Sequence, residues 1–163
     1  MSALDVIYNQ TITLFNRIPG KNGEPTMWVP TVIDGVHLIV NRSSSWNNHG
    51  GKTADNTRLH VPFVWRGDDA MVVCRDGEKK WYKPKEWRRE PDPEAGITFS
   101  FGENDDFDFF IEGTVDEFSG QISDRDFERK GFYGYMNKTY DNVFVISSVE
   151  KFSLIPHFEI MAR

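Results

Sequence analysis

The chain has 163 residues, a net charge of −6 and a single cysteine. This length suits one domain that buries roughly two thirds of its unfolded surface. One cysteine excludes an intramolecular disulfide and a multi-cysteine zinc site, and the acidic balance argues against general affinity for a nucleic-acid backbone. The N-terminus has no signal-peptide pattern, and no apolar run reaches the ~18 residues that cross a bilayer. We therefore expect a cytosolic origin and no membrane segment.

Alternating apolar and polar residues, the period of a β-strand, begin in segment 5–18. Ile12 and Leu14 share one face of this strand, and Phe15 lies on the other. Segment 27–40 holds two short apolar runs separated by an Asp-Gly pair at 34–35. Such a pair tolerates the positive φ of a tight turn, so this segment predicts a hairpin.

The polar segment 42–56 ends with part of a phosphate-binding sequence, Gly50-Gly51-Lys52-Thr53. A P-loop needs another glycine five positions before the second of these glycines, and that position is Trp46. The following residues alternate like a strand, whereas a P-loop enters a helix. We interpret 42–56 as a flexible polar loop.

The remaining elements follow in chain order. We expect strands at 57–65 and 70–74 joined as a hairpin, a strand at 79–82, a short helix at 84–89, strands at 97–101 and about 107–115, a helix at 122–132 capped by Ser123 or Asp124, and strands at 142–152 and after Pro156. No β-helix-β spacing repeats, which argues against a parallel α/β sheet. The pattern predicts an all-β fold: one domain over 1–163, a β-barrel or sandwich of about eight to nine strands with one or two short helices and long loops. Within it, 42–56 is a flexible loop and 119–140 an insert with a short helix.

A basic and aromatic segment, 78–90, interleaves lysine and arginine with Trp81, Tyr82 and Trp87. Aromatic rings beside cations can stack nucleic-acid bases. We favour the alternative, in which the rings face a core and the charged stems cover them.

Residues that could carry chemistry are scattered. The histidines, at 37, 49, 60 and 157, lie singly and lack the short spacings of a zinc site. Cys74 ends an apolar strand and is interpreted as a buried hydrophobic residue. We therefore assign no catalytic, cofactor or metal residues and expect no enzymatic activity.

Acidic residues at 103–108 resemble a calcium loop only in composition. An EF-hand register starting at Asn104 would place Phe109 and Val115 where glycine and glutamate are required. We interpret these residues as an acidic turn that keeps a sheet edge soluble. The carboxylates Glu112, Asp116 and Glu117, together with the 14% aromatic content, motivate an alternative function, a carbohydrate-binding or hydrolytic β-sandwich.

Five segments between about Thr31 and Phe158 follow one another in an order that is informative about the family: TVIDGVHL, KTADNTRLHVPF, WYKPKEW, FFIEGTVDE, and YDNVFVISSVEKF with a terminal PHFEI. Together they resemble a family of small structural proteins of tailed bacteriophages and prophages, encoded among capsid, connector and tail genes. The chain differs from that family in its longer insert and in its Ser/Asn-rich loop.

The resemblance implies a non-enzymatic virion assembly protein, a head-completion or head-tail connector (stopper) subunit. Such a subunit forms a homo-oligomeric ring between portal or adaptor and tail, in the neck of the virion, after assembly in the bacterial host cytoplasm. DNA would pass its channel only as cargo, and neither cofactor nor membrane is involved. A tail terminator or another tail protein is the nearest variant.

Two interface regions follow from that hypothesis. Loop residues Trp46, Asn47, Asn48 and His49 either order against a ring neighbour or belong to an ordinary mobile surface loop. The aromatics of the insert, Phe127, Phe132, Tyr133 and Tyr135, must pack either on the barrel or on a partner.

Overall fold

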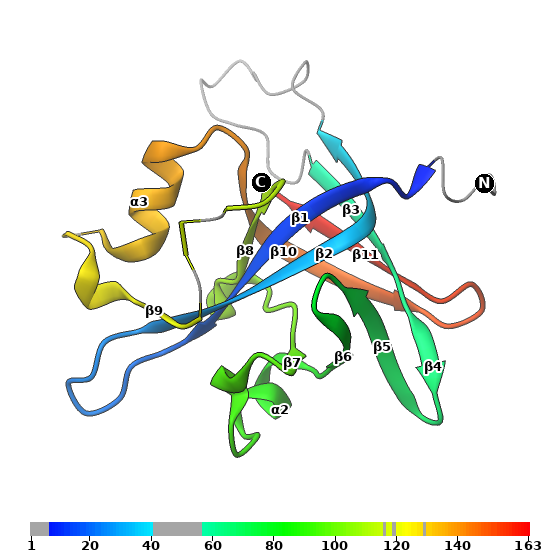
Figure 1. The fold of residues 1–163 in the computed structure, drawn as a ribbon, viewed down its shortest axis with the longest axis horizontal. Coiled ribbons are helices and arrows are strands. Elements are labelled where there is room, and N and C mark those ends of the chain that lie inside the picture. Colours follow the sequence, from blue (N-terminus) through cyan, green and yellow to red (C-terminus); the bar gives the residue numbers. More distant parts are fainter. Residues whose placement is uncertain (1–6, 41–56, 116, 119, 129) are drawn as a thin grey trace.

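β-strands are the main regular structure of the computed structural model, which describes residues 7–40, 57–115, 117, 118, 120–128 and 130–163 (Figure 1). The strands are β1 Gln10–Ile18, β2 Met27–Val40, β3 Thr57–Pro62, β4 Val64–Arg66, β5 Asp69–Cys74, β6 Gly77–Trp81, β7 Thr98–Phe99, β8 Phe109–Glu112, β9 Ile122–Ser123, β10 Val143–Phe152 and β11 His157–Ala162. The helices are α2 Pro84–Arg88 and α3 Gly131–Thr139, with 3₁₀ turns at Pro93–Ala95, Asn104–Asp106 and Asp124–Asp126. The predicted all-β class is confirmed. The expected flexible loop, 42–56, lies outside the described residues.

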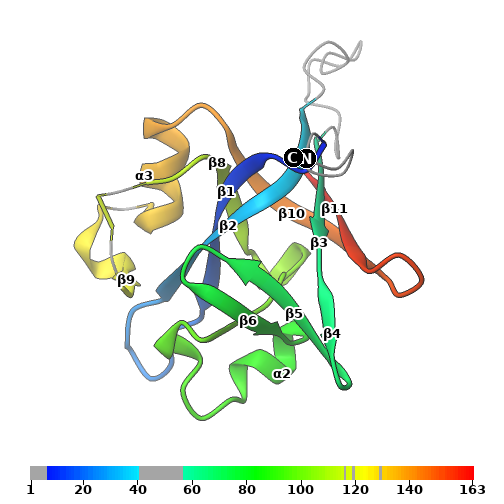
Figure 2. The ribbon, with the colours of Figure 1, turned by 45° about the vertical axis from the view of Figure 1, so that its right-hand side comes forward.

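Six strands of the described chain close into an antiparallel barrel in the order β1-β8-β10-β11-β3-β2, and β2 pairs back with β1. The closing β1–β2 ladder runs along the whole of β1. β9 adds to the start of β2, where Met27 pairs with Ser123. A smaller sheet, β4-β5-β6-β7, lies with α2 toward one end of the barrel (Figure 2).

One hydrophobic core fills the barrel and continues under the small sheet. Ile12 and Leu14 of β1 face this interior together with Phe158 of β11. Val72 of β5 and Phe99 of β7 belong to the same cluster. The small sheet therefore covers one end of the barrel and extends its core.

A second cluster lies on the outer face of the barrel, beneath α3. Phe15 of β1 and Phe109 of β8 stack at 5.0 Å between ring centroids, and Phe132 of α3 lies 5.0 Å from Phe15. β1 is consequently buried on both faces, with Ile12 and Leu14 inward and Phe15 outward.

The hairpin predicted at 34–35 is wrong, because β2 runs without interruption from Met27 to Val40. Gln10 pairs with Val36 and Thr11 with Asp34, so one residue of β2, Gly35, is left over. Gly35 has φ of 71°. The Asp-Gly pair forms a β-bulge, which needs the same positive φ as a tight turn but does not reverse the chain.

The helix predicted at 122–132 lies further along the chain, at Gly131–Thr139. Ser123 accepts a hydrogen bond from the N–H of Arg125 and so begins only a 3₁₀ turn. Asp124 instead accepts from the N–H of Phe132, at 2.9 Å, and from Nε1 of Trp28, at 2.7 Å. Asp124 therefore satisfies one N–H in the first turn of α3, although it is not the N-cap, which is Lys130.

A buried carboxylate, Asp108, ties β1 to the segment that leads into β8. Its oxygens accept hydrogen bonds from the backbone N–H of Arg17 at 2.8 Å, from Nδ2 of Asn16 at 2.8 Å and from the N–H of Gly102 at 2.6 Å. Asn16 also donates to the carbonyl of Ser100, at 2.6 Å. The interpretation of this stretch as a solvated acidic turn is wrong for Asp108.

Asp106, in the same stretch, also has a structural role, since it pairs with Arg88 of α2 at 2.6 Å. The pair fixes α2 against the turn that precedes β8.

Replacing Gly102 with alanine should destabilise the protein by about 1–3 kcal/mol, the usual cost of overpacking. The added Cβ would lie 2.7 Å from Oδ2 of Asp108 and 2.7 Å from Cβ of Asp106. Urea unfolding of wild type and Gly102→Ala measures the difference. A loss below about 0.5 kcal/mol, as for ordinary surface changes, would contradict the close approach.

The Asp108 carboxyl should titrate near neutral pH. Burial raises the pKa of Asp108 to about 7, although its hydrogen-bond donors act in the opposite direction. Because the folded-state pKa exceeds the unfolded value of about 3.9, the folded protein holds a proton that the unfolded chain releases. This contribution to stability is complete below about pH 4 and is lost as the pH rises to about 7. Carbon-13 NMR of the carboxyl checks the midpoint, and a midpoint below about pH 5 would contradict it.

Candidate functional site

The two predicted interface regions have different outcomes. Trp46, Asn47, Asn48 and His49 lie outside the described residues. The insert aromatics lie beneath and around α3, where they pack against the outer face of the barrel.

Phe132 is fully buried within the chain, so it has no surface to offer a partner. Phe127, Tyr133 and Tyr135 are half-buried, and the rings of Phe127 and Tyr135 lie 5.0 Å apart. Of the two alternatives for this insert, packing on the barrel accounts for Phe132, and the other three keep some exposed surface.

The hairpin formed by β10 and β11 extends beyond the barrel in both views (Figures 1 and 2). Its turn carries Leu154, which is 98% exposed, and Ile155, which is 75% exposed. We call these two residues the hairpin tip. The sequence predicted both strands and the break at Pro156, but a run of alternating residues does not show how far a hairpin projects.

The part of the hairpin next to its turn, which we call the hairpin base, contacts the small sheet and the segment before it. Nζ of Lys151 lies 4.7 Å from the ring centroid of Trp65 and 5.2 Å from that of Trp81. The N–H of Phe63 donates to the carbonyl of Pro156 at 3.2 Å. The hairpin tip is thus presented from a base that is held in place.

A row of histidines crosses the outer face of the barrel at this base, over strands β2, β3 and β11. His37 is directly opposite His60, with ring centroids 5.7 Å apart. His60 stacks on His157 at 5.9 Å, and His157 stacks on Phe152 at 5.0 Å. Strand pairing therefore brings together residues that are isolated in the sequence.

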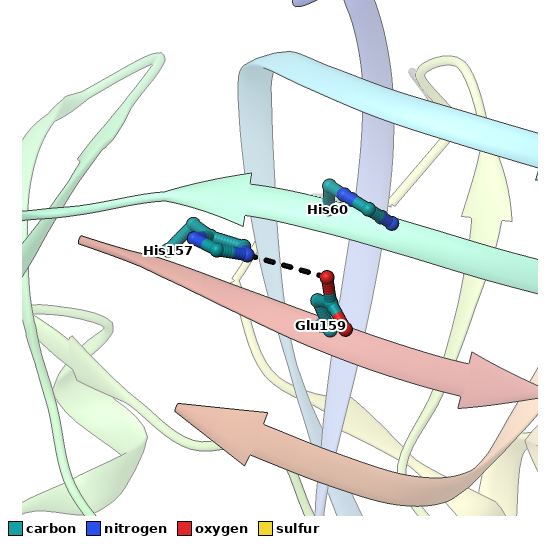
Figure 3. Close-up of side chains that lie close together, drawn as sticks. All are labelled: His60, His157 and Glu159. Atoms are coloured by element: carbon teal, nitrogen blue, oxygen red, sulfur yellow. Dashed lines mark hydrogen bonds and ion pairs between the residues drawn. The ribbon is translucent and has the colours of Figure 1, made fainter. Parts of the chain in front are cut away.

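Glu159 joins the row because it is directly opposite His60 in the β3–β11 ladder and two residues after His157. The donor atoms of His60, His157 and Glu159 all lie within 4.8 Å of one another, and all three residues are half-buried (Figure 3). Nε2 of His157 is 3.4 Å from Oε1 of Glu159. We call these three residues the histidine cluster.

The protonation of the cluster follows from its surroundings. Nδ1 of His157 lies 2.6 Å from the carbonyl oxygen of Ile155. A carbonyl only accepts, so Nδ1 carries a proton and Nε2 is directed toward Glu159. Burial lowers the pKa of His60, an effect opposed by the nearby Glu159 charge. The lowered pKa of His60 favours its neutral imidazole, which is the form that binds a metal ion.

A small hollow of about 150 Å³ adjoins the cluster and is lined in part by Arg58, His60, Glu150 and Glu159. Glu150 is directly opposite Glu159 in the β10–β11 ladder. A hollow of this volume can hold an ion with its water ligands but not a large organic substrate.

The carboxylates that motivated a carbohydrate site are engaged separately. Glu112 accepts a hydrogen bond from Asn142 at 2.7 Å, and Glu117 accepts from Tyr140 at 2.9 Å. Asp116 lies outside the described residues. Glu112 and Glu117, the two described residues of this set, therefore contact different partners.

Cys74 is buried, as expected, and burial raises the pKa of its thiol to about 11. A thiol with such a pKa is a poor nucleophile. Trp87 is also buried, in agreement with the structural interpretation of the basic and aromatic segment.

Comparison with known proteins places almost the whole chain in one family. Residues 7–163 match the model of a family described as a family of unknown function (DUF6751). No curated protein and no solved structure matches the chain. Among the described residues, no helix has the length and hydrophobicity that spanning a bilayer requires.

Lys151→Met should destabilise the protein by about 0.5–1 kcal/mol, because methionine keeps the apolar stem but removes the cation from the aromatic rings. Urea unfolding followed by tryptophan fluorescence measures the change. Lys138→Met, at an exposed position of α3, is the matched control. Equal losses in the two variants would contradict a cation–π contribution at the hairpin base.

Proposed function

The chain belongs to the family of unknown function DUF6751, and for this member we propose a non-enzymatic role as a subunit of a larger protein assembly. The observation that carries the proposal is the hairpin tip, where Leu154 and Ile155 are 98% and 75% exposed. The wild-type surface thus includes an apolar projection that its own fold does not cover.

Adjacent apolar side chains on a projection are suited to insertion into a partner. Burying one such side chain contributes about 1.5–3 kcal/mol. The contacts of Lys151 and Phe63 fix the base beforehand, so less conformational entropy is lost on docking.

A second copy of the chain is the partner that we propose. A hollow of about 350 Å³ lies along β1 and β2. Its lining includes the partly exposed apolar residues Val32, Val115 and Phe118 and the charged residues Asp76, Lys79 and Glu94. The hairpin extends away from these strands in both views (Figures 1 and 2). Insertion of one tip into the next subunit's hollow is a heterologous contact, which generates a ring when the rotation closes.

The finer proposal is that this ring is a head-tail connector or stopper in the neck of a tailed bacteriophage, between portal or adaptor and tail. The resemblance of five sequence segments to phage structural proteins supports it. The net charge of −6 also supports it, because an acidic channel wall lets DNA pass without binding its backbone. Assembly would take place in the host cytoplasm.

Removing the apolar tip should abolish assembly without unfolding the barrel. We expect Leu154→Ser/Ile155→Ser to remain monomeric under conditions in which wild type forms a ring, alone or on the portal protein encoded in the same genome. Val73→Ser, at a 59% exposed position of β5, is the matched control and should assemble normally. Native mass measurement across a concentration series gives the result.

Circular dichroism and thermal unfolding establish that the variants are folded. Wild type that stays monomeric at every concentration, with and without portal, would overturn the proposal. So would a double variant that assembles as well as wild type.

A further inference from the structure

We propose that His60, His157 and Glu159 form a binding site for a divalent transition metal, with Zn²⁺ as the best-fitting ion (Figure 3). This site lies beside the hairpin tip, because Nδ1 of His157 contacts the carbonyl oxygen of Ile155, but the inference does not depend on the proposed assembly.

The spacing of the donor atoms supports a metal site. Zinc–nitrogen bonds of about 2.1 Å in a tetrahedron place ligand atoms about 3.4 Å apart. Nε2 of His157 and Oε1 of Glu159 already have this separation, 3.4 Å. The remaining separations, within 4.8 Å, need a contraction that side-chain rotation can supply.

That rotation is available at Glu159, whose side chain is 41% exposed. The two histidines lie on paired strands of the barrel, since His60 belongs to β3 and His157 to β11. Two imidazoles on a rigid ladder and one mobile carboxylate are a suitable combination for closing around an ion.

Orientation of His157 provides an independent argument. Its Nδ1 donates to the Ile155 carbonyl at 2.6 Å, which is the contact that metal-bound histidines usually make with their second nitrogen. The lone pair of Nε2 in the neutral ring then faces a carboxylate oxygen. Two acceptors repel each other at this distance, and either a proton on Nε2 or a shared cation removes the repulsion.

The donor set selects the kind of ion. Two imidazole nitrogens and one carboxylate are the ligands of many Zn²⁺ sites that keep a fourth position for water. Calcium and magnesium prefer sites made of oxygen ligands. The adjoining polar hollow, of about 150 Å³, provides room for that water.

The ion would link β3 directly to β11 at the base of the hairpin. His60 comes from the first of these strands, and the other two ligands come from the second. Zinc should therefore stabilise the folded protein as a ligand that binds only the native state.

Another histidine of the row supplies a matched control. His37 lies against His60 at 5.7 Å between ring centroids, but it is not part of the cluster of donor atoms. Removing it deletes an imidazole from the same surface without removing a proposed ligand. His49 is a second control, which tests any contribution from segment 42–56.

Isothermal titration of the full chain, without a histidine tag, with ZnCl₂ near pH 7.5 tests the site. We expect saturation at one ion per chain. His157→Gln and Glu159→Gln should each bind zinc at least about tenfold more weakly, because replacing a residue that only contacts a metal ligand already costs about tenfold in affinity. His37→Gln and His49→Gln should bind within about twofold of wild type. Zinc should raise the melting temperature of wild type, and a chelator should reverse the rise.

Cobalt substitution gives an independent reading, because tetrahedral Co²⁺ bound by wild type should show visible absorption that Glu159→Gln reduces. Glu159→Gln preserves side-chain size at a partly exposed position, so it keeps the test informative if a histidine variant unfolds. Absence of saturable zinc binding would overturn the proposal. Equal losses in His37→Gln and His157→Gln would also overturn it.

Discussion

Closure of the barrel is the constraint on which the rest of the structure depends. A row of unpaired backbone groups along a sheet edge is avoided when every strand has a neighbour on both sides. Here β11 fulfils that requirement by pairing with β3 on one side and β10 on the other. This position sets the register of β11, and the register places Glu159 opposite His60. Pairing of β11 with β3 and β10 extends to His157, so the turn that follows Phe152 lies beyond the paired strands and exposes its tip.

Much of the fold could be predicted from side-chain alternation alone, because a barrel wall separates an apolar interior from an outer face. The strand at the C-terminal side of Pro156 and the short helix at Pro84 were both correctly located. The failures came where a local signal has two structural meanings. Asp34-Gly35 supplies a positive φ, and only the partner strand decides whether that φ makes a turn or a bulge.

The candidate site was much less predictable, because its residues meet only through pairing of distant strands. His60 and His157 lie singly in the sequence, and no spacing rule joins them. Each histidine alternates with apolar residues along its segment, which predicts a strand and an outward-facing ring. The pattern does not show which strand lies next to it. Asp108 shows the same limit, because three N–H donors from two segments, β1 and Gly102, make a buried site for a residue that looks like part of a solvated turn.

The apolar tip and the histidine cluster are connected through the stiffness of one hairpin. A hairpin is marginally stable unless it packs against something else, and here β11 also pairs with β3 from His157 to Ala162. On one face of the hairpin, Lys151 contacts the rings of Trp65 and Trp81. On the other face, the rings of His60, His157 and Phe152 stack on one another. An ion at the cluster would link β11 to β3 on the face of the hairpin opposite to Lys151. A tip held from both faces can enter a partner without first being ordered, and its apolar surface is then used for affinity rather than for folding.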